Sequence, residues 1–254
     1  GNASLTLAGD VDPELALELV RRYFDGIPSG KPIPAVVGVA QTPDGGQEVA
    51  KASYLLLEDR IELPRLYLAW RTPPLFAAGD AGMDMVADVL TGGKTSRLYR
   101  TLVYDRRIAT DVNAAQGSRE LGGWFCISAT AAPGHELVEL EKVIADEVES
   151  LAARGPEDWE IERSLAQVEA QFVYRLQTVG GFDGRSDQLN AYNVFTGDPG
   201  FMEQDRNRYR DITSGHVKEL ASTQLNVSGR VALSIVPEGS PARALVGSTP
   251  AEVA

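Results

Sequence analysis

The sequence predicts an α+β fold in which a largely antiparallel, mixed sheet of about five or six strands is covered by helices on one face. Two observations lead to this prediction. Short segments with strand-like alternation follow one another with only a few turn residues between them, which favours antiparallel neighbours. Long segments with apolar residues at helical spacing are grouped after residue 136 instead of alternating with the strands. This order argues against a doubly wound parallel sheet.

The first 26 residues predict a strand followed by a helix. Leu5–Gly9 alternates leucines with polar or small residues, which predicts a core strand. Asp12 is suited to cap a helix N-terminus, and Pro13 is suited to the first helical position. Apolar residues then recur at helical spacing up to Gly26, which can end the helix. Because a core strand opens the chain, we expect the chain to start within a longer protein.

The next part of the chain predicts an irregular connector, two strands and a helix. Ile27–Gly46 is rich in proline and glycine, which is typical of a connector. Val49–Glu58 predicts one strand and Arg65–Arg71 predicts a second. One face of the second strand is formed by Leu66, Leu68 and Trp70. A Thr-Pro-Pro sequence ends that strand, and Ala81–Leu90 predicts a helix.

A β-hairpin and two long helices are expected after that helix. Ile108–Gln116 and Gly122–Thr130 predict the hairpin. Apolar residues at helical spacing predict the two helices, and Gly155-Pro156 separates them. The residues of the first helix are Leu137, Leu140, Ile144, Val148 and Leu151, and those of the second are Ile161, Leu165, Val168, Phe172 and Leu176.

The last third of the chain predicts shorter elements. Asp183–Phe195 and Thr213–Ser222 predict two helices, and Val231–Pro237 alternates as a final strand. The remaining residues are rich in Gly, Pro, Ser and Ala. We therefore predict one α+β domain over residues 1–237, followed by a linker-like tail over residues 238–254.

Composition excludes several classes of partner. The chain carries 36 acidic residues against 24 lysines and arginines, a net charge of −12. An acidic chain without a basic patch argues against binding to nucleic acid or to an anionic membrane. No apolar run approaches the roughly 20 residues that span a bilayer, so we expect a soluble protein of the periplasm or the cytoplasm. Cys126 is the only cysteine, which excludes an internal disulfide, and its strand-like surroundings predict a buried core residue.

The most informative block of the sequence is Leu90–Ala115, LTGGKTSRLYRTLVYDRRIATDVNAA. Its Gly92–Thr95 segment looks like the end of a phosphate-binding loop. That loop needs an earlier glycine where this chain has Asp88, and it should follow a strand rather than a helix. The block therefore predicts a tight helix–turn–helix, with Thr95 or Ser96 capping the second helix.

The chain has only two histidines, which limits metal and acid–base chemistry. His135 and Glu139 lie one helical turn apart, like the two histidines of H-E-x-x-H, and with His216 they are the only candidate ligands. Both histidines fall at predicted helix starts, where exposed side chains are the norm. H-x-x-E-H and G-x-S-x-G are absent. We therefore predict no catalytic residue and no metal site in this chain.

Four segments, in order and spacing, resemble a known family. They are LTLAGDVDP at Leu5–Pro13, SRLYRTLV at Ser96–Val103 after the double glycine, the strand pair ending at Thr130, and VALSIVP at Val231–Pro237. Together they resemble the C-terminal, non-zinc domain of one half of a pitrilysin/insulinase-type zinc metallopeptidase, the family of the mitochondrial processing peptidase. The match covers residues 4–237.

The resemblance implies an accessory role. In this family each half holds two similar α+β domains, and the first domain of the catalytic half carries H-x-x-E-H and the zinc. The chain would be the second domain of a half, enclosing the chamber for the peptide substrate and packing against the catalytic domain and the other half of the peptidase. Zinc would then lie in the missing domain, and the chain alone would be inactive.

Two alternatives stay open. The parent could be a non-catalytic scaffold or peptide-binding member of the same fold, and H-x-x-E-H upstream of this chain would decide between the two. An unrelated α+β binding module could also mimic the pattern.

The resemblance also suggests where substrate contacts would lie. Some second domains of the non-catalytic half carry an arginine, and seven residues later a tyrosine, at the equivalent helix–strand junction. Val103 and Thr110 occupy these positions here, so the pair is missing, which favours the catalytic half as the parent. A shift of the alignment would instead bring Arg100 or Arg107 near the arginine position. Arg100, Arg107 and Thr110 are therefore the candidate residues of the substrate chamber.

Overall fold

The computed structural model describes residues 3–31, 34 and 52–252. The chain divides into two compact units. Unit 1 comprises residues 1–37 and 167–208, and unit 2 comprises residues 38–166 and 209–254. The boundary falls inside the long helix α4 (Asp158–Gln177). Each unit is described by itself.

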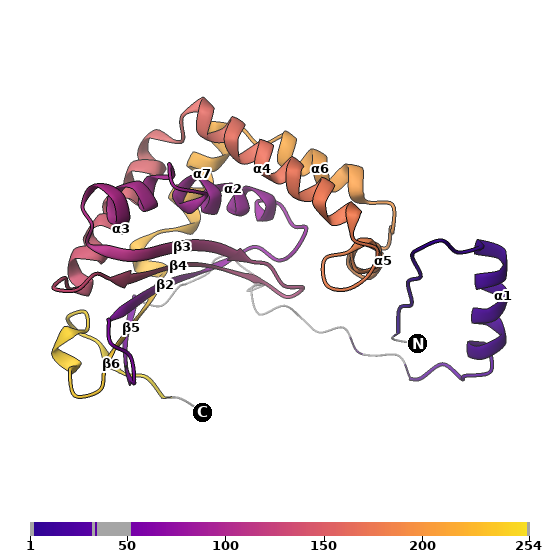
Figure 1. Cartoon of the computed structure of the whole chain (residues 1–254), viewed down its shortest axis with the longest axis horizontal. Coiled ribbons are helices and arrows are strands. Elements are labelled where there is room, and N and C mark those ends of the chain that lie inside the picture. The colour runs from indigo at the N-terminus through magenta and orange to yellow at the C-terminus, as the bar shows by residue number, and fades with distance from the viewer. Residues whose placement is uncertain (1–2, 32–33, 35–51, 253–254) are drawn as a thin grey trace. The chain divides into compact units, whose positions relative to one another are not determined.

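Unit 2 is built on a six-stranded mixed sheet with the strand order β3-β4-β2-β5-β1-β6 (Figure 1). Strand β2 pairs antiparallel with β4 and β5, and β3 and β4 form an antiparallel hairpin. Strand β1 pairs parallel with β5 and β6. The predicted α+β class with a largely antiparallel mixed sheet is confirmed. The strands are β1 (Ser53–Asp59), β2 (Arg65–Thr72), β3 (Ala109–Gly117), β4 (Gly123–Ala131), β5 (Val231–Pro237) and β6 (Thr249–Pro250).

One strand pairing differs from the prediction. Strands β1 and β2 are joined by a short turn and were expected to pair, but β5 lies between them. A short turn makes two consecutive strands antiparallel, but it does not require them to pair with each other. A later strand can lie between them and pair with each of the two. Here β5 pairs parallel with β1 and antiparallel with β2.

Three helices of unit 2 cover one face of the sheet (Figure 1). They are α2 (Asp80–Thr91), α3 (Leu137–Arg154) and α7 (Ser214–Gln224). The strand residues that alternate toward these helices are buried, as predicted for β2, and include Leu66, Leu68 and Trp70 of β2 and Phe125, Ile127 and Ala129 of β4. These side chains and the apolar stripes of the three helices form the core. Burial of this apolar surface is the main force that holds the sheet and helices together.

The other face of the sheet, here called the open face, carries no described α-helix of unit 2. Its residues alternate away from the core and, apart from Gly117 and Ser128, are half-buried or exposed. They include Arg65, Tyr67 and Arg71 of β2, Asp111 and Asn113 of β3, Trp124, Cys126 and Thr130 of β4, and Leu233 and Ile235 of β5. Cys126 was expected in the core. It is half-buried on the open face instead, and burial raises the pKa of its thiol.

The chain beyond β5 packs on the sheet in its described part, up to residue 252. A short 3-10 helix, η3 (Pro241–Arg243), leads to β6, which pairs with β1. Leu245 is only 4% exposed, and its amide donates a hydrogen bond of 3.1 Å to the Ser234 hydroxyl. The division into one domain over residues 1–237 and a linker-like tail stays a prediction. The described part of that tail nevertheless contacts the sheet through β6 and Leu245.

Unit 1 contains α1 (Pro13–Phe24), the C-terminal part of α4, α5 (Arg185–Thr196) and most of α6 (Met202–Arg210). Helix α5 is fixed to α6 by a buried phenol, because the Tyr192 hydroxyl donates a 2.8 Å hydrogen bond to Asp205. The Tyr192 ring also meets Phe201 edge-on, with ring centres 5.7 Å apart. No helix among the described residues is both long and apolar enough to cross a membrane.

The start of the chain agrees with the prediction in its helix and differs in its strand. Asp12 accepts hydrogen bonds from the amides of Glu14 and Leu15, and Pro13 opens α1, as expected. Leu5–Gly9 forms no strand. A strand needs a neighbour for its backbone groups, and the described residues supply none here. The predicted connector Ile27–Gly46 lies mostly outside the described residues.

Candidate functional site

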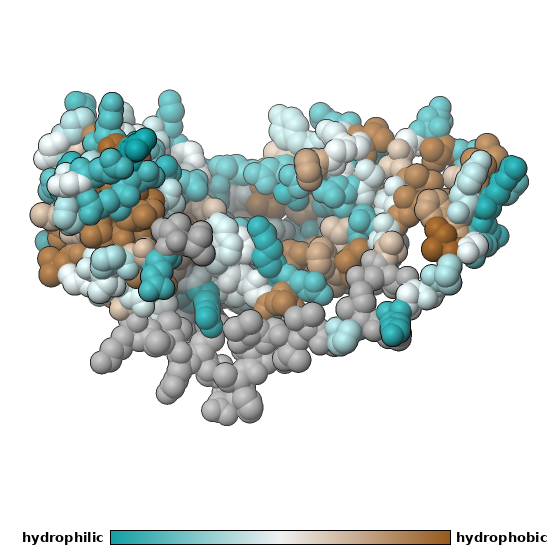
Figure 2. Space-filling view, turned by 90° about the horizontal axis from the view of Figure 1, so that it is seen from below, coloured by the Kyte–Doolittle hydropathy of each residue, from teal (hydrophilic) through white to brown (hydrophobic). Residues whose placement is uncertain are grey.

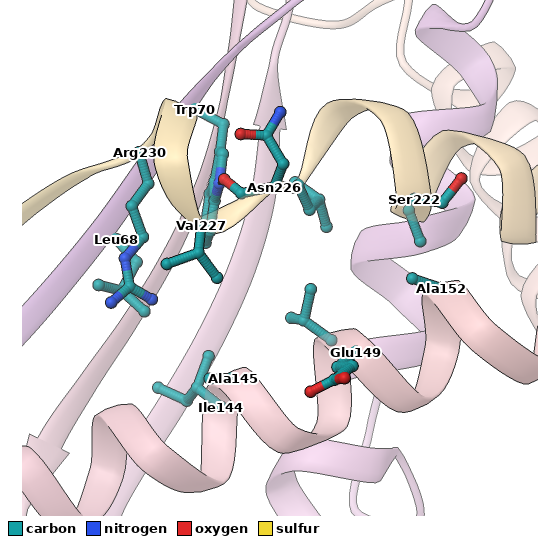
Figure 3. Close-up of a pocket in the computed structure, with 13 residues that line it drawn as sticks. Leu68, Trp70, Ile144, Ala145, Glu149, Ala152, Ser222, Asn226, Val227 and Arg230 are labelled. Carbon is teal, nitrogen blue, oxygen red and sulfur yellow. The ribbon is translucent and has the colours of Figure 1, made fainter. Parts of the chain in front are cut away.

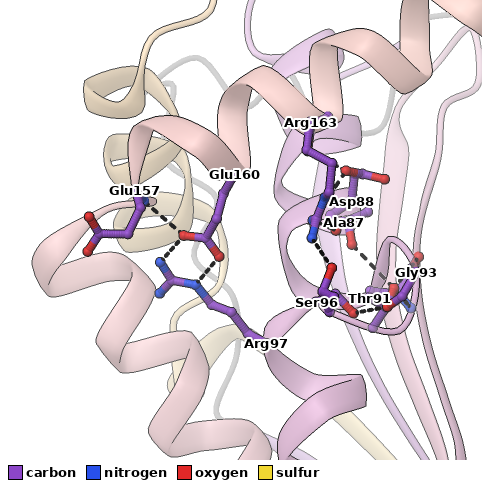
Figure 4. Close-up of polar contacts among 12 residues, drawn as sticks. Ala87, Asp88, Thr91, Gly93, Ser96, Arg97, Glu157, Glu160 and Arg163 are labelled. Carbon is purple, nitrogen blue, oxygen red and sulfur yellow. Dashed lines mark hydrogen bonds and ion pairs between the residues drawn. The ribbon is translucent and has the colours of Figure 1, made fainter.

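The turn after α2 is closed by its own side chains and backbone (Figure 4). Gly93 has a φ of +84°, a conformation that glycine adopts without strain. The Ser96 hydroxyl donates a 2.6 Å hydrogen bond to the Gly93 carbonyl. Thr91 at the end of α2 accepts a 2.8 Å hydrogen bond from the Ala114 amide of β3. The predicted tight turn between two helices is therefore present. The Ser96 carbonyl accepts a 2.9 Å hydrogen bond from the Arg100 amide, so Ser96 stands at the start of the second helix, and the capping role of the Thr95 or Ser96 side chain stays a prediction.

Asp88 belongs to the framework of this turn. Its carboxylate accepts a hydrogen bond from the Ser164 hydroxyl and lies 3.6 Å from Arg163 Nη2. Arg163 also donates to the Asp88 carbonyl at 3.1 Å and to Thr95 Oγ1 at 3.2 Å. The turn is thus tied to α4 by a negatively charged residue, which agrees with the sequence argument against phosphate binding.

The helix after the turn is anchored by a second ion pair. Arg97 donates two hydrogen bonds to the Glu160 carboxylate, of 2.8 Å from Nε and 2.5 Å from Nη2. It also donates one to the Gly155 carbonyl. The Arg97 side chain is 16% exposed and that of Glu160 is 3% exposed. Burial raises the pKa of Glu160, but hydrogen bonds from Arg97 and the Glu157 amide outweigh it and leave the pKa below its usual value. The ionised Arg97–Glu160 pair therefore holds the helix after the turn against α4.

This support leads into an irregular junction between helix and strand. The helix η1 (Tyr99–Asp105) has π geometry, which is rare and often found at functional sites. Arg107 has a φ of +56°, a left-handed conformation that costs energy for a residue other than glycine. A β-bulge between Ala109 and Asp111 then sets Thr110 apart from the regular pairing of β3 with β4. Three departures from regular backbone within 13 residues mark this segment.

The predicted chamber residues all lie exposed at this junction. Arg100 makes an exposed ion pair with Asp105 at 3.4 Å. The Thr110 hydroxyl donates to the Thr130 carbonyl at 3.4 Å. Among the described residues, no hydrogen bond or ion pair joins any two of Arg100, Arg107 and Thr110. Their role in a chamber stays a prediction, and we call these three residues the junction site.

Sequence reasoning missed some neighbours of the junction site. Tyr104 is 72% exposed and lies in the same π-helix as Arg100. Asp111, just beyond the bulge, pairs with Arg65 of β2 at 3.9 Å across the open face. The YDRR sequence that ends η1 could have drawn attention to Tyr104, since an aromatic residue among charges is unusual on a surface. Nothing local in the sequence predicts that the Arg65 side chain extends across β4 to Asp111 of β3.

The three candidate metal ligands, His135, Glu139 and His216, form hydrogen bonds near the starts of α3 and α7. His135 Nδ1 lies 3.1 Å from the Glu139 carboxylate, and the Glu136 amide donates to the same carboxylate at 3.0 Å. The amide hydrogen bond first, and His135 second, hold the pKa of Glu139 below its usual value. His216 Nδ1 accepts a 3.3 Å hydrogen bond from the Thr213 amide at the start of α7. His216 therefore completes the N-terminus of α7, whereas His135 precedes α3 and contacts Glu139 of its capping box.

A catalytic zinc site needs about three protein ligands around one point. In the part of the chain that the structure describes, no group of three or more His, Cys, Asp or Glu side chains could hold a metal ion. These residues do not fit a zinc ion, and no chemical step of this chain is assigned to one.

Solved structures share this fold over most of the chain. A protease from Helicobacter pylori is 17% identical, with a TM-score of 0.76 over 91% of this chain and 54% of that one. The peptidase M16 inactive domain from Pseudomonas fluorescens is 20% identical, with a TM-score of 0.72 over 95% and 54%. The inactive peptidase domain of a protein named as a zinc protease from Bordetella parapertussis is 20% identical, with a TM-score of 0.62 over 73% and 96%. The chain thus spans about half the length of the first two. None of the curated proteins matches it.

The family model described as the peptidase M16 inactive domain matches residues 1–168, which is more than half of the chain. The match includes the Leu90–Ala115 block, the turn that Asp88 and Arg97 hold, and the junction site. It confirms the resemblance to the C-terminal, non-zinc domain of pitrilysin-type peptidases. The chain belongs to the M16 peptidase family, as its inactive domain.

Proposed function

We propose that this chain is the accessory part of a zinc metallopeptidase, which encloses the peptide substrate chamber and packs against a catalytic domain outside this sequence. The observation that carries the proposal is the open face of the sheet. The described helices of unit 2 cover one face of its sheet, and we propose the other face as the wall of a chamber.

The chemistry of the open face suits a peptide. Arg65 lies 5.2 Å from the Tyr67 ring on its own strand and pairs with Asp111 of β3, so charged and aromatic groups lie together on the open face. Strand β3 also forms one edge of the described sheet. An edge strand offers unpaired backbone groups with which an extended peptide can pair. These features support a role in holding peptide chains without strict sequence preference.

The junction site lies at the start of that edge strand. Arg100, Arg106 and Arg107 are exposed there, although the whole chain carries a net charge of −12. A local excess of arginine favours carboxylate groups of a substrate. The left-handed Arg107 and the bulge at Thr110 cost energy, which supports a functional reason for keeping them.

The packing surface toward the catalytic domain would include α1. No residue of α1 is buried, although the helix is amphipathic. Figure 2 shows hydrophobic side chains gathered along one side of this helix and hydrophilic ones along the other. They are Leu15, Leu17, Leu19 and Phe24. An apolar stripe of this kind favours burial against a partner. The partner we propose is the catalytic domain, because the similar protease from Helicobacter pylori is about twice as long as this chain.

The zinc of the parent enzyme would be held by H-x-x-E-H in that catalytic domain. A second half of the peptidase would close the chamber, and a peptide would be the substrate. The same surfaces could serve a non-catalytic, peptide-binding member of the family. An upstream sequence without H-x-x-E-H would turn the proposal toward that alternative.

The test uses the parent protein, with the missing domain included. Replacing Arg107 by Ala should raise KM for an acidic peptide about tenfold with little change in kcat, because one charge-assisted contact is lost. Arg60→Ala is the matched control, since Arg60 lies in the turn between β1 and β2 and its side chain is 88% exposed. Equal KM values for the two variants would overturn the assignment of the junction site to the chamber.

A further inference from the structure

The two edges of the described sheet differ in length. One edge is β6, which has only two residues and includes Pro250, a residue without an N–H to offer a neighbouring strand. The other edge is β3, which has nine residues. A long edge strand carries a row of backbone groups that can pair with another chain, and natural sheets block or shorten such edges.

The backbone of β3 alternates between its partner strand and the edge. In an antiparallel pair, every second residue turns both its N–H and its C=O toward the partner, and the residues between them turn theirs away. Ala114 turns away from β4, because its N–H donates a 2.8 Å hydrogen bond to the hydroxyl of Thr91 at the end of α2. Val112, two residues earlier in the same regular register, therefore turns its N–H and C=O to the same edge.

Thr91 occupies this edge at Ala114. Besides accepting the Ala114 N–H, its Oγ1 lies 3.4 Å from the Ala114 carbonyl oxygen and 3.2 Å from the Ala87 carbonyl oxygen, to either of which it can donate its single proton. The Thr91 side chain thus stands where the backbone of an added strand would lie. Among the described residues, no side chain and no backbone group outside the sheet bonds the N–H or C=O of Val112.

We propose that Thr91 is a positioning residue that limits how an extended peptide pairs with β3. The peptide pairs with Val112, beside the junction site, and Thr91 stops the pairing before Ala114. This role rests on the proposed function of β3 as a peptide site, and it adds where the pairing lies and what ends it. The favoured partner is therefore a short extended segment of peptide rather than a long β-strand.

The test follows amide hydrogen exchange of Val112 and Ala114 in the ¹⁵N-labelled full chain. The probe is the acetylated and amidated pentapeptide Thr-Val-Thr-Val-Thr, whose residues favour the extended conformation. In the wild type, we expect the peptide to slow exchange at Val112 and to leave Ala114 unchanged, because Thr91 already holds the Ala114 N–H.

Thr91→Ala removes the hydroxyl and opens the edge. Without peptide, the Ala114 amide should exchange about tenfold faster than in the wild type, since it loses one hydrogen bond. With peptide, exchange should slow at both Val112 and Ala114, and the peptide should bind about three- to tenfold more tightly. Thr91→Ser keeps the hydroxyl and should restore the wild-type pattern.

Two further variants serve as controls. Thr95→Ala is the matched control, because Thr95 lies in the same turn but bonds Arg163 instead of β3. A pocket of about 210 Å³ between the sheet and helices α3 and α7 offers a second place for a valine side chain of the probe (Figure 3). Ala145→Leu fills that pocket from α3. Both variants should leave the exchange pattern of β3 as it is in the wild type.

The possible outcomes separate this role from the proposed function. Slowed exchange at Val112 and Ala114 alike in the wild type would overturn the role of Thr91, since the pairing would then continue past it. A Thr91→Ala chain with the wild-type pattern and affinity would also overturn it, because something other than Thr91 would close the edge. Slowed exchange at Ala114 in Thr91→Ala, without any at Val112 in the wild type, would support the role of Thr91 and count against β3 as a peptide site.

Discussion

Single residues hold the turn after α2, and Arg97 is one of them. Its guanidinium is bound to Glu160 and to the Gly155 carbonyl, and both side chains of the ion pair are largely buried. Removing one partner of a buried pair leaves the other charge without compensation. This position differs from Arg100, three residues later, whose ion pair with Asp105 is exposed.

We therefore predict that Arg97→Ala lowers the free energy of unfolding by about 3–5 kcal/mol. Arg100→Ala, the matched control in the same segment, should lower it by less than about 1 kcal/mol. Urea unfolding of both variants measures the difference. Similar midpoints for the two variants would show that the Arg97–Glu160 pair is not the support described here.

The pH dependence of stability gives a second test of the same pair. The pKa of Glu160 lies below its ordinary value of 4.5 in the folded chain. The stability that this carboxylate contributes is therefore present above about pH 4.5 and is lost as the pH falls through the folded-state pKa. In Arg97→Ala, burial dominates and raises that pKa, so protonation of Glu160 relieves an uncompensated buried charge. We therefore expect the difference in melting temperature between the variant and the wild type to shrink as the pH falls, because the wild type loses the contribution of Glu160 while the variant gains from its protonation. An unchanged profile between pH 7 and 3 would contradict this account.

At the scale of elements, local patterns predicted most helices and strands. Helices α2, α3 and α4 and strands β2 to β5 lie within a few residues of their predicted positions, because long periodic segments carry a strong local signal. The position of β5 between β1 and β2 could not be predicted, since it depends on contacts between residues more than 150 positions apart. The π geometry of η1 has no sequence signature either.

The role of the candidate site stays a prediction, and its local geometry was not predicted. Thr110 occupies an aligned position and Arg100 and Arg107 came from a shift of that alignment, and the structure places all three on one exposed junction. The left-handed φ of Arg107 has no signal in the sequence, because glycine or asparagine is the residue expected there. The ion pair between Arg65 and Asp111 depends on the sheet register, which emerges only when the strands assemble.

The chain after β5 allows a prediction about an element. Leu245 is 4% exposed, whereas its neighbour Val246 is 94% exposed. If β6 and the turn before it belong to the fold, Leu245→Ala should destabilise the protein by about 2–5 kcal/mol. Val246→Ala is the matched control and should stay within about 0.5 kcal/mol of the wild type. Equal melting temperatures for the two variants would instead support the linker-like tail that the sequence predicts.

At the scale of the whole molecule, we propose that the chain is one part of a larger enzyme. The family model of the inactive domain covers residues 1–168, the chain spans about half the length of two similar solved structures, and α1 exposes its apolar side. The described residues offer no group of metal ligands. These observations support the proposal that the chemistry belongs to a domain outside this sequence and that this chain supports the substrate.

The most direct test of this claim measures zinc content and peptide cleavage on two samples, the chain alone and the parent protein with its upstream domain. After dialysis against trace zinc, the chain alone should hold no stoichiometric zinc and cleave no quenched fluorescent peptide. The parent should hold one zinc per catalytic half and lose cleavage when a chelator removes it. One zinc per chain in the isolated chain, with cleavage that a chelator abolishes, would contradict the account and make His135, Glu139 and His216 the first residues to replace.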